Sequence, residues 1–193
     1  MFCDGELIQK IDTLLRSKDH AVIAIDGRCA AGKTTLAAKI GEHYNAAVIH
    51  MDDFFLRPEQ RTPERYAQPG GNVDRERFFQ EVLHPLCEGR SVLYRPFDCM
   101  AQRFSKPVTV PTTTLTVVEG SYSCHPELWD SYDLHIFLSV DSQTQMQRIL
   151  QREGAERAET FRKQWIPLEE MYFSAFHPER RAEVYRRMDR GIE

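Results

Sequence analysis

Paired or clustered cysteines are missing from this chain. Its cysteines are odd in number, are scattered along the sequence and never show C-x-x-C spacing: Cys3, Cys29, Cys87, Cys99 and Cys124. This distribution argues against a disulfide framework and against a structural zinc site, because both need several cysteines at matched spacings. We therefore expect a protein of a reducing compartment.

An excess of positive charge and a long apolar segment are also missing. Lys and Arg number 25 against 29 Asp and Glu, which gives a net charge of −4. Such a chain has no broad attraction for nucleic acid or anionic lipid, so any cationic function is local and a small-molecule partner is favoured. Residues 1–17 carry several charged side chains, and no apolar run approaches membrane-spanning length. We expect no signal peptide, no membrane span and a cytoplasmic location.

The length and the pattern of apolar residues indicate one α/β domain over residues 1–193. A content of 41% hydrophobic and 28% charged residues is ordinary for a globular protein. Nearly continuous apolar runs predict buried parallel strands at residues 21–25, 46–51, 115–118 and 134–140. Helical spacing covers residues 7–15, 75–87 with Asp74 as N-cap, and 142–153. The alternation predicts a parallel sheet with helices on both faces.

A complete phosphate-binding pattern, G-x-x-x-x-G-K-[ST], lies between the first predicted strand and the next helix. Its residues, with the one that follows, are Gly27, Arg28, Cys29, Ala30, Ala31, Gly32, Lys33, Thr34 and Thr35. Gly27 and Gly32 let successive backbone N–H groups turn inward around phosphates at the positive end of the helix. We expect Lys33 to reach the β- and γ-phosphates of ATP and Thr34 to ligate Mg²⁺. The flanking strand and helix disfavour a chance match.

Acidic residues follow two of the predicted strands, at the edge of the sheet where the phosphate loop also lies. Asp52 and Asp53 follow the second strand, and Glu119 follows the third. A carboxylate held in line can accept the proton of an attacking hydroxyl, and another can reach the metal ion. Only one of two adjacent acids is expected to be the base. The alternative for the aspartates is a solvated turn with capping side chains.

Arginines follow the fourth predicted strand. Arg148 and Arg152 share a helix face and could clamp the transferring phosphate oxygens as part of a lid over about residues 148–162. A solvated helix face is an equal alternative for Arg152 and the preferred interpretation for Arg157. His50, His125, Phe54-Phe55 and Trp165 are interpreted mainly as core or rim groups, with a minority expectation that the aromatic residues line an acceptor pocket.

Taken together, these motifs resemble the uridine kinase and pantothenate kinase branch of the phosphate-loop (P-loop) kinases. The resemblance rests on these segments: Ile25-Asp26-Gly27, Gly32-Lys33-Thr34-Thr35, Met51-Asp52-Asp53-Phe54-Phe55-Leu56 and Val118-Glu119-Gly120. It implies a P-loop NTPase-type fold of three layers with an Arg-bearing lid. It further implies Asp52 as catalytic base, Glu119 as metal-side acid, Asp74 as a contact to sugar hydroxyls, and Arg148 and Arg152 as lid arginines.

Two departures from the family pattern concern the substrate and the sheet. Pro96-Phe97-Asp98-Cys99 stands where pyrimidine nucleoside kinases carry Val-Tyr-Asp-Phe, so Phe97 lacks the tyrosine hydroxyl at the base pocket. Residues 178–193 are charged and helical in pattern where the family ends with an apolar strand. This tail predicts either a sheet that is one strand short or an edge closed by a partner copy in a homodimer.

The sequence therefore predicts a Mg²⁺-assisted, ATP-dependent kinase for a small hydroxyl acceptor. A nucleoside, as in uridine kinases, is the first candidate for the acceptor, and pantothenate or another small alcohol is the alternative. A nucleotide-binding switch with little turnover is the alternative from another class. Acids at both Asp52 and Glu119 disfavour the switch, because a switch needs no base for an added hydroxyl.

Overall fold

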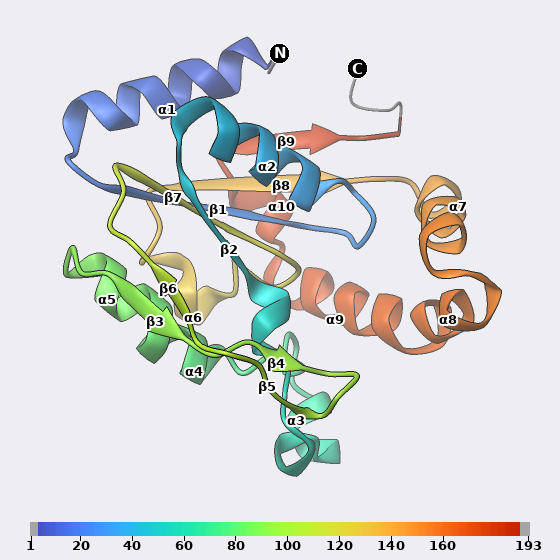
Figure 1. The fold of residues 1–193 in the computed structure, drawn as a ribbon. Coiled ribbons are helices and arrows are strands. Elements are labelled where there is room, and N and C mark those ends of the chain that lie inside the picture. Colours follow the sequence, from blue (N-terminus) through green and yellow to red (C-terminus); the bar gives the residue numbers. More distant parts are fainter. Residues whose placement is uncertain (1–3, 190–193) are drawn as a thin grey trace.

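A parallel sheet of five strands forms the centre of the computed structural model, which describes residues 4–189 (Figure 1). The strand order is β2-β7-β1-β8-β9. The strands are β1 (Ala21–Gly27), β2 (Ala47–His50), β7 (Leu115–Glu119), β8 (Leu134–Ser139) and β9 (Val184–Arg187). The first four confirm the strands predicted from the apolar runs. Cys3 and the end of the charged tail lie outside the described residues.

The register of the sheet brings the polar strand ends to one edge. Ile25 of β1 pairs with Glu119 of β7, and His50 of β2 also pairs with Glu119. Every residue of β1 is buried. A strand buried on both faces reads as a continuous apolar run rather than an alternating one. The carboxyl ends of β1, β2 and β7 therefore carry the phosphate loop and the acidic residues side by side.

The prediction for the tail was wrong, because residues 184–187 form a fifth strand. β9 pairs in parallel with β8, from Ile136 opposite Val184 to Ser139 opposite Arg187. Val184 is buried, whereas Tyr185 is 45% exposed. A strand at the edge of a sheet needs few apolar residues, and charged side chains there discourage pairing with other chains. The described sheet therefore ends with an edge strand, β9, whose charged sequence gives no apolar run by which it could be predicted.

Helices cover both faces of the sheet, as the alternation of elements predicted (Figure 1). On one face, Ile23 and Ile25 of β1 pack with Leu7 and Ile11 of α1 and with residues of α2. These helices are α1 (Gly5–Ser17) and α2 (Lys33–Tyr44). The buried Leu7 and Ile11 are four residues apart, which places them on the same helix face. This amphipathic first helix packs against the sheet through one face and confirms the helix predicted over residues 7–15.

The other face of the sheet carries a second apolar core. Val22 and Ala24 of β1 pack there with Phe78, Val82 and other buried residues. The helical elements between β2 and β3 are η1 (Met51–Phe54), η2 (Pro58–Gln60), α3 (Pro63–Tyr66), α4 (Arg75–Phe78), the π-helical η3 (Phe79–Leu83) and α5 (His84–Cys87). The helix α6 (Pro126–Trp129) follows β7. Asp74 caps α4 by accepting a hydrogen bond from the Arg77 amide, as expected.

Two short antiparallel ribbons occupy the segment between α5 and β7. β3 (Val92–Tyr94) pairs with β6 (Val108–Val110), and β4 (Phe97–Asp98) pairs with β5 (Arg103–Phe104). In Figure 1 the β4–β5 ribbon lies beyond the end of β2, near α3. The long connections of the sequence therefore project from the edge of the sheet that carries the phosphate loop, where ligands of parallel sheets bind.

The lid segment and the chain that follows it form one run of helices. Its elements are α7 (Ser142–Glu153), α8 (Ala155–Thr160), the π-helical η4 (Phe161–Trp165), α9 (Ile166–Phe176) and α10 (Pro178–Arg181). Gly154 separates α7 from α8 with a φ of 80°, a conformation that glycine adopts without strain. Figure 1 shows α9 returning from α8 beneath the sheet.

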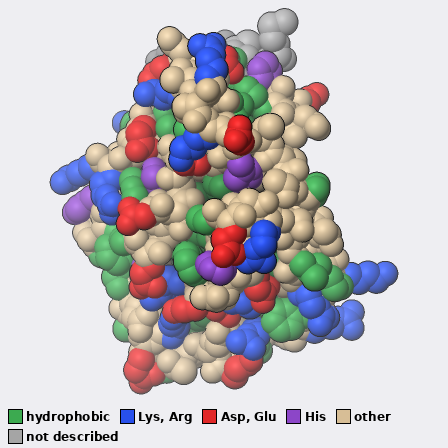
Figure 2. Space-filling view, turned by 90° about the vertical axis from the view of Figure 1, so that its left-hand side faces the viewer, with side chains coloured by type: hydrophobic (Ala, Val, Ile, Leu, Met, Phe, Trp, Pro, Cys, Tyr) green, Lys and Arg blue, Asp and Glu red, His purple; other side chains and the backbone are tan. Residues whose placement is uncertain are grey.

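The surface agrees with the nearly balanced charge of the sequence. Figure 2 shows acidic and basic side chains interspersed over the face that it displays. No helix within residues 4–189 combines the length and the apolar character needed to cross a membrane.

The carboxylate of Asp26, at the end of β1, joins three segments of the chain. It accepts hydrogen bonds from the backbone amides of Gly27 (2.6 Å), Tyr122 (3.0 Å) and Cys124 (3.0 Å). The hydroxyl of Tyr172 on α9 donates a fourth, at 2.8 Å. Asp26 is fully buried, and this desolvation raises its pKa although all four bonds favour the charged form. The network fixes α9 and the turn after β7 to the start of the phosphate loop.

We expect Tyr172→Phe to lower the free energy of unfolding by about 1–3 kcal/mol, because it removes a donor from a buried carboxylate and leaves the ring in place. Urea unfolding followed by circular dichroism measures the change. Tyr185→Phe is the control, since Tyr185 is 45% exposed, and it should change the stability by about 0.5 kcal/mol or less. Equal effects of the two substitutions would contradict the role given to the Asp26 network.

Candidate active site

The phosphate loop has the backbone conformation that its glycines were expected to provide. Gly27 has a φ of 133°, and a Cβ atom there would lie 1.9 Å from the carbonyl oxygen of Leu138. Gly32 has a φ of 93° and is the N-cap of α2. The first amides of α2 have no intrahelical partner and carry the positive end of the helix dipole. The loop is therefore built to accept an anion at the start of α2.

Backbone carbonyl groups of the phosphate loop hold the side chain of Lys33 in place. Its ammonium group donates to the carbonyl oxygens of Gly27 (2.8 Å) and Arg28 (3.0 Å) and to the hydroxyl of Ser121 (3.2 Å). The side chain is nearly buried. A nearly buried ammonium group favours a negatively charged ligand. These contacts place the positive charge of Lys33 at the loop, where a phosphate group needs it.

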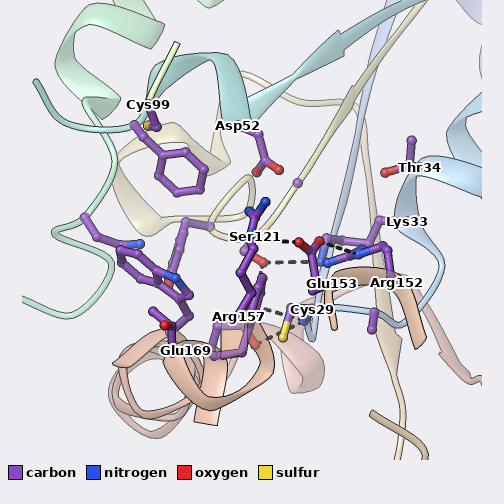
Figure 3. Close-up of a pocket in the computed structure, with 18 of the residues that line it drawn as sticks. Cys29, Lys33, Thr34, Asp52, Cys99, Ser121, Arg152, Glu153, Arg157 and Glu169 are labelled. Carbon is purple, nitrogen blue, oxygen red and sulfur yellow. Dashed lines mark hydrogen bonds and ion pairs between the residues drawn. The ribbon is translucent and has the colours of Figure 1, made fainter. Parts of the chain in front are cut away.

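A cavity of about 940 Å³ opens beside the loop (Figure 3). The predicted site residues on its wall are Cys29, Ala30, Ala31, Gly32, Lys33, Thr34, Thr35, Asp52, Glu119, Arg148 and Arg152. Gly27 and Arg28, the first residues of the loop, are not on the wall. The volume is in the range of pockets that bind nucleotide-sized ligands. Residues from the phosphate loop, η1, β7 and α7 thus meet at one cavity.

Thr34 and Glu119 form an oxygen-rich corner of this cavity. The Thr34 hydroxyl donates to Glu119 at 3.1 Å, and the Nδ1 atom of His50 lies 2.5 Å from the same carboxylate oxygen. The hydrogen bond with Glu119 raises the pKa of His50, against the effect of burial. Within residues 4–189, no group of three or more His, Cys, Asp or Glu residues could hold a metal ion. A hydroxyl and one carboxylate fit Mg²⁺, which keeps waters and takes substrate phosphate oxygens as its other ligands.

The two adjacent aspartates differ in what they contact. Tyr94 donates a hydrogen bond to Asp53 at 2.8 Å, whereas no described residue donates one to Asp52. Solvent reaches Asp52 through the cavity, but the surrounding protein desolvates its carboxylate and thereby raises its pKa, while the charge of Lys33 lowers it. Asp52 is consequently the aspartate with a free carboxylate on the cavity, and Asp53 is engaged with the β3 strand.

The arginines of the lid segment have different partners. Arg148 donates to the carbonyl oxygens of Ala30 (3.2 Å) and Met188 (2.7 Å), so it ties the phosphate loop to the chain after β9. Arg152 and Arg157 both pair with Glu153, at 2.8 and 3.1 Å. Both are more than half exposed, so these ion pairs are weak and easily exchanged. Arg157, which the sequence analysis placed on a solvated face, also lies on the cavity wall.

Asp74 and Phe97 are not on the cavity wall. The Asp74 carboxylate accepts a hydrogen bond from the side-chain amide of Gln60 at 2.8 Å and caps α4. Phe97 is buried against the ring of Phe104, with ring centroids 5.6 Å apart. Cys99, two residues after Phe97, does line the cavity. The structure therefore does not bring these two residues together with the phosphate loop.

The sequence analysis missed several residues of the cavity. Ser121 and Glu169 lie against the phosphate loop, Arg61 and Tyr66 come from the connection after β2, and all four line the wall. A glutamate in the middle of a helix and a serine after a Glu-Gly pair carry no spacing signal that distinguishes them from surface residues. Phe55 and Trp165 also line the wall, in agreement with the minority expectation, whereas Phe54 is buried in the core.

His125 is buried and acts as a structural group. Desolvation lowers its pKa to about 4, and its Nδ1 atom accepts a hydrogen bond from the amide of Glu127 at the start of α6. Its ring stacks on Tyr172 of α9. The interpretation of His125 as a satisfied core histidine is confirmed.

Sequence comparison relates the chain to uridine kinases, although no protein-family model matches it. It is 30% identical over 144 residues to a uridine kinase of Halobacterium salinarum, covering 70% of this chain and 63% of that protein. It is 28% identical over 150 residues to uridine-cytidine kinase A of Dictyostelium discoideum, covering 74% and 30%. A tRNA-specific adenosine deaminase subunit of Schizosaccharomyces pombe is 27% identical over 175 residues, covering 85% and 42%. The chain spans less than two thirds of the length of each of these proteins.

Comparison of folds agrees with this relationship. The structure of a possible uridine kinase from Bacillus stearothermophilus superposes with a TM-score of 0.65, covering 93% of this chain and 98% of that one. At 22% sequence identity, this likeness concerns the fold. In sequence the chain is similar to uridine kinases, and in fold it has the parallel α/β architecture of P-loop NTPases.

Proposed function

We propose that the chain is an ATP-dependent kinase that transfers the γ-phosphoryl group to the hydroxyl of a small acceptor, with a nucleoside as the first candidate. The observation that carries this proposal is the free carboxylate of Asp52 on the same cavity wall as Lys33 and Thr34. A protein that only binds and hydrolyses nucleotide has no need for an unpaired acid facing an acceptor space. The uridine kinases among the relatives support a nucleoside acceptor.

In the proposed reaction, Asp52 is the general base. The acceptor hydroxyl transfers its proton to the Asp52 carboxylate while its oxygen attacks the γ-phosphorus, and the bond between that phosphorus and the β–γ bridging oxygen breaks to release ADP. The raised pKa of Asp52 makes its carboxylate a stronger base than an aspartate with the ordinary pKa. Asp53 cannot serve equally well while Tyr94 holds it at 2.8 Å.

The phosphate loop and the oxygen-rich corner have separate tasks in this proposal. Lys33 exchanges its loop carbonyl partners for phosphate oxygens, and the amides at the start of α2 hold the adjacent phosphate. Thr34 and Glu119 are the residues that would hold Mg²⁺, and His50 orients the Glu119 carboxylate. When bound, Mg²⁺ supplies charge neutralisation for the phosphate oxygens.

Glu153 keeps Arg152 and Arg157 at the mouth of the cavity. Both arginines pair with this one carboxylate, and the pairs are solvent-exposed. A phosphoryl group that develops charge can therefore compete for either arginine at little cost. Arg148 differs, because its two backbone partners fix it to the loop and to the chain after β9, which suits a residue that shapes the loop.

An acceptor screen with a coupled ADP readout tests the proposal. The panel contains uridine, cytidine and adenosine, with pantothenate and simple sugars as the other alcohols. ADP release that depends on a nucleoside supports the nucleoside assignment. Transfer only to a non-nucleoside alcohol would leave the kinase chemistry and remove the nucleoside, and ADP release that no acceptor stimulates would remove both.

Lys33→Ala is expected to abolish transfer and to weaken binding of a non-hydrolysable ATP analogue severely, because the loop loses the point charge on the phosphates. Isothermal titration calorimetry measures the binding and the coupled assay measures transfer. Lys39→Ala, in the same helix and outside the cavity wall, is the matched control and should bind normally. Near-normal turnover of Lys33→Ala would contradict the assignment of the phosphate loop.

We expect Asp52→Asn to lower kcat by roughly 10²-fold or more with nucleotide binding nearly intact, since general-base catalysis typically contributes 10² to 10⁴ and the amide keeps the shape. Asp53→Asn should be milder, because Asp53 contacts Tyr94 rather than the cavity. Steady-state kinetics of both variants with the best acceptor measure the difference. A larger loss of kcat in Asp53→Asn than in Asp52→Asn would show that Asp53, and not Asp52, is the base.

The pH dependence of kcat should have an acidic limb that belongs to Asp52. The base works only when it is ionised, so kcat falls as the pH decreases through the pKa of Asp52, and desolvation raises that pKa above the ordinary value of about 3.9. Measurement of kcat from pH 8 downward, with circular dichroism to confirm folding, locates the limb. The residual activity of Asp52→Asn should lack it. A limb that persists in this variant would point to another group.

A further inference from the structure

Glu169 of α9 makes an unusual contact with the phosphate loop. Its carboxylate accepts hydrogen bonds from the backbone amide of Cys29, at 3.0 and 3.1 Å for its two oxygens, and from the hydroxyl of Ser121 at 2.7 Å. The side chain is only 3% exposed and lines the cavity. Figure 3 shows Glu169, Cys29 and Ser121 around the same space. The Glu169 carboxylate thus accepts a hydrogen bond from a backbone amide of the phosphate loop, and such amides are suited to bind phosphate.

Ser121 connects this carboxylate to the ammonium group of Lys33. The Ser121 oxygen accepts from Lys33 at 3.2 Å and its hydroxyl donates to Glu169 at 2.7 Å. Lys33 and Glu169 are therefore opposite charges bridged by one hydroxyl. Desolvation raises the pKa of Glu169, while Lys33 and the two donors lower it. In this arrangement Glu169 is a counter-charge for the loop lysine.

The neighbouring residues of α9 keep Glu169 in this position. Tyr172, one turn further along, is bonded to Asp26 at 2.8 Å, and Glu170 pairs with Arg28 of the loop. Residues three apart on a helix lie on the same face, so the Tyr172 bond presents Glu169 to the loop. The α9 helix cannot move away from the loop without breaking the buried bond between Tyr172 and Asp26.

We propose that Glu169 is a specificity-determining residue that sets the preference of the loop between nucleoside triphosphate and diphosphate. This inference rests on the proposed kinase function. The β-phosphate, common to ATP and ADP, belongs at the start of α2, where Gly32 caps the helix. The γ-phosphate adds negative charge on the acceptor side of the loop, in the cavity that Glu169 shares with Asp52. Like charges that face each other in a desolvated site repel strongly.

The consequence is a selective penalty on the third phosphate. The triphosphate competes with Glu169 for Lys33 and meets its negative charge, whereas the diphosphate uses mainly the donors at the start of α2. Replacement by glutamine keeps the volume, offers an oxygen to the Cys29 amide and removes the charge. Glu169→Gln should therefore tighten binding of the triphosphate more than binding of the diphosphate.

Calorimetric titration with ADP and with a non-hydrolysable ATP analogue, both with excess Mg²⁺, tests this inference. For Glu169→Gln we expect the Kd of the analogue to fall about tenfold relative to the Kd of ADP, compared with the same ratio in the wild type. Glu42→Gln removes an equal charge from an exposed position near the end of α2, outside the cavity wall, and should leave the ratio unchanged. Thermal unfolding of both variants confirms that they are folded.

Ser121→Ala provides a second test if Glu169→Gln is poorly folded. It removes the bridge between Lys33 and Glu169 and leaves the Cys29 contact in place, so the ratio should move in the same direction by a smaller factor. An unchanged ratio in Glu169→Gln, or weaker binding of the analogue than of ADP, would overturn the role of Glu169. A wild type that binds neither nucleotide would instead overturn the proposed function, on which this inference rests.

Discussion

The buried carboxylate of Asp26 is the contact on which the geometry of the site depends. A charged group in the interior is costly unless donors surround it, and here three backbone amides and one tyrosine hydroxyl do so. The donors come from the start of the phosphate loop, from the turn after β7 and from α9. Each segment is therefore fixed relative to the others by the need to solvate one carboxylate. The hydrogen bonds to Asp26 therefore also set the relative positions of the loop, Ser121 and Glu169.

A second chain of contacts reaches the loop from the opposite side. Arg148 of α7 donates to Ala30 in the loop and to Met188 after β9, and the Met188 amide donates to Ser139 at the end of β8. The phosphate loop is thus held by α9 on one side and by α7 with the edge of the sheet on the other. Between these two anchors lie Gly154, α8 and η4, which carry Arg157 and Trp165. This is the segment for which the sequence predicts a lid, and a lid that closes over a substrate needs a segment of this kind beside the cavity.

The strands β1, β2, β7 and β8, the start of α4 after Asp74, the bounds of α7 and the phosphate loop could be predicted because each leaves a local signal. Continuous apolar runs follow from burial on both faces, and the G-x-x-x-x-G-K-[ST] spacing follows from the path of one loop. β9 could not be predicted, since an edge strand buries Val184 and exposes Tyr185, and its arginines suggest a helix or coil. The family resemblance predicts that Asp74 and Phe97 contact the substrate, but neither residue lies on the cavity wall. A sequence pattern does not say which face of a ribbon or loop is turned toward the cavity. Glu169 is distant in sequence from every residue that it contacts, so only the tertiary arrangement of α9 reveals it.

The balance of charges along the cavity explains why the same wall can accept a polyanion and still hold a free acid. Lys33, Arg61, Arg148, Arg152 and Arg157 supply positive charge, while Asp52, Glu119, Glu153 and Glu169 supply negative charge. Several of these acids are paired with a cation or a donor: Glu153 with Arg152 and Arg157, Glu119 with Thr34 and His50, Glu169 with Cys29 and Ser121. Each of these pairs includes a cation or a hydrogen-bond donor that could also bind a phosphate group. In the proposed function, nucleotide binding would exchange these internal partners for phosphate oxygens. Asp52 has no such donor among the described residues, which leaves it available as the base of the proposed reaction.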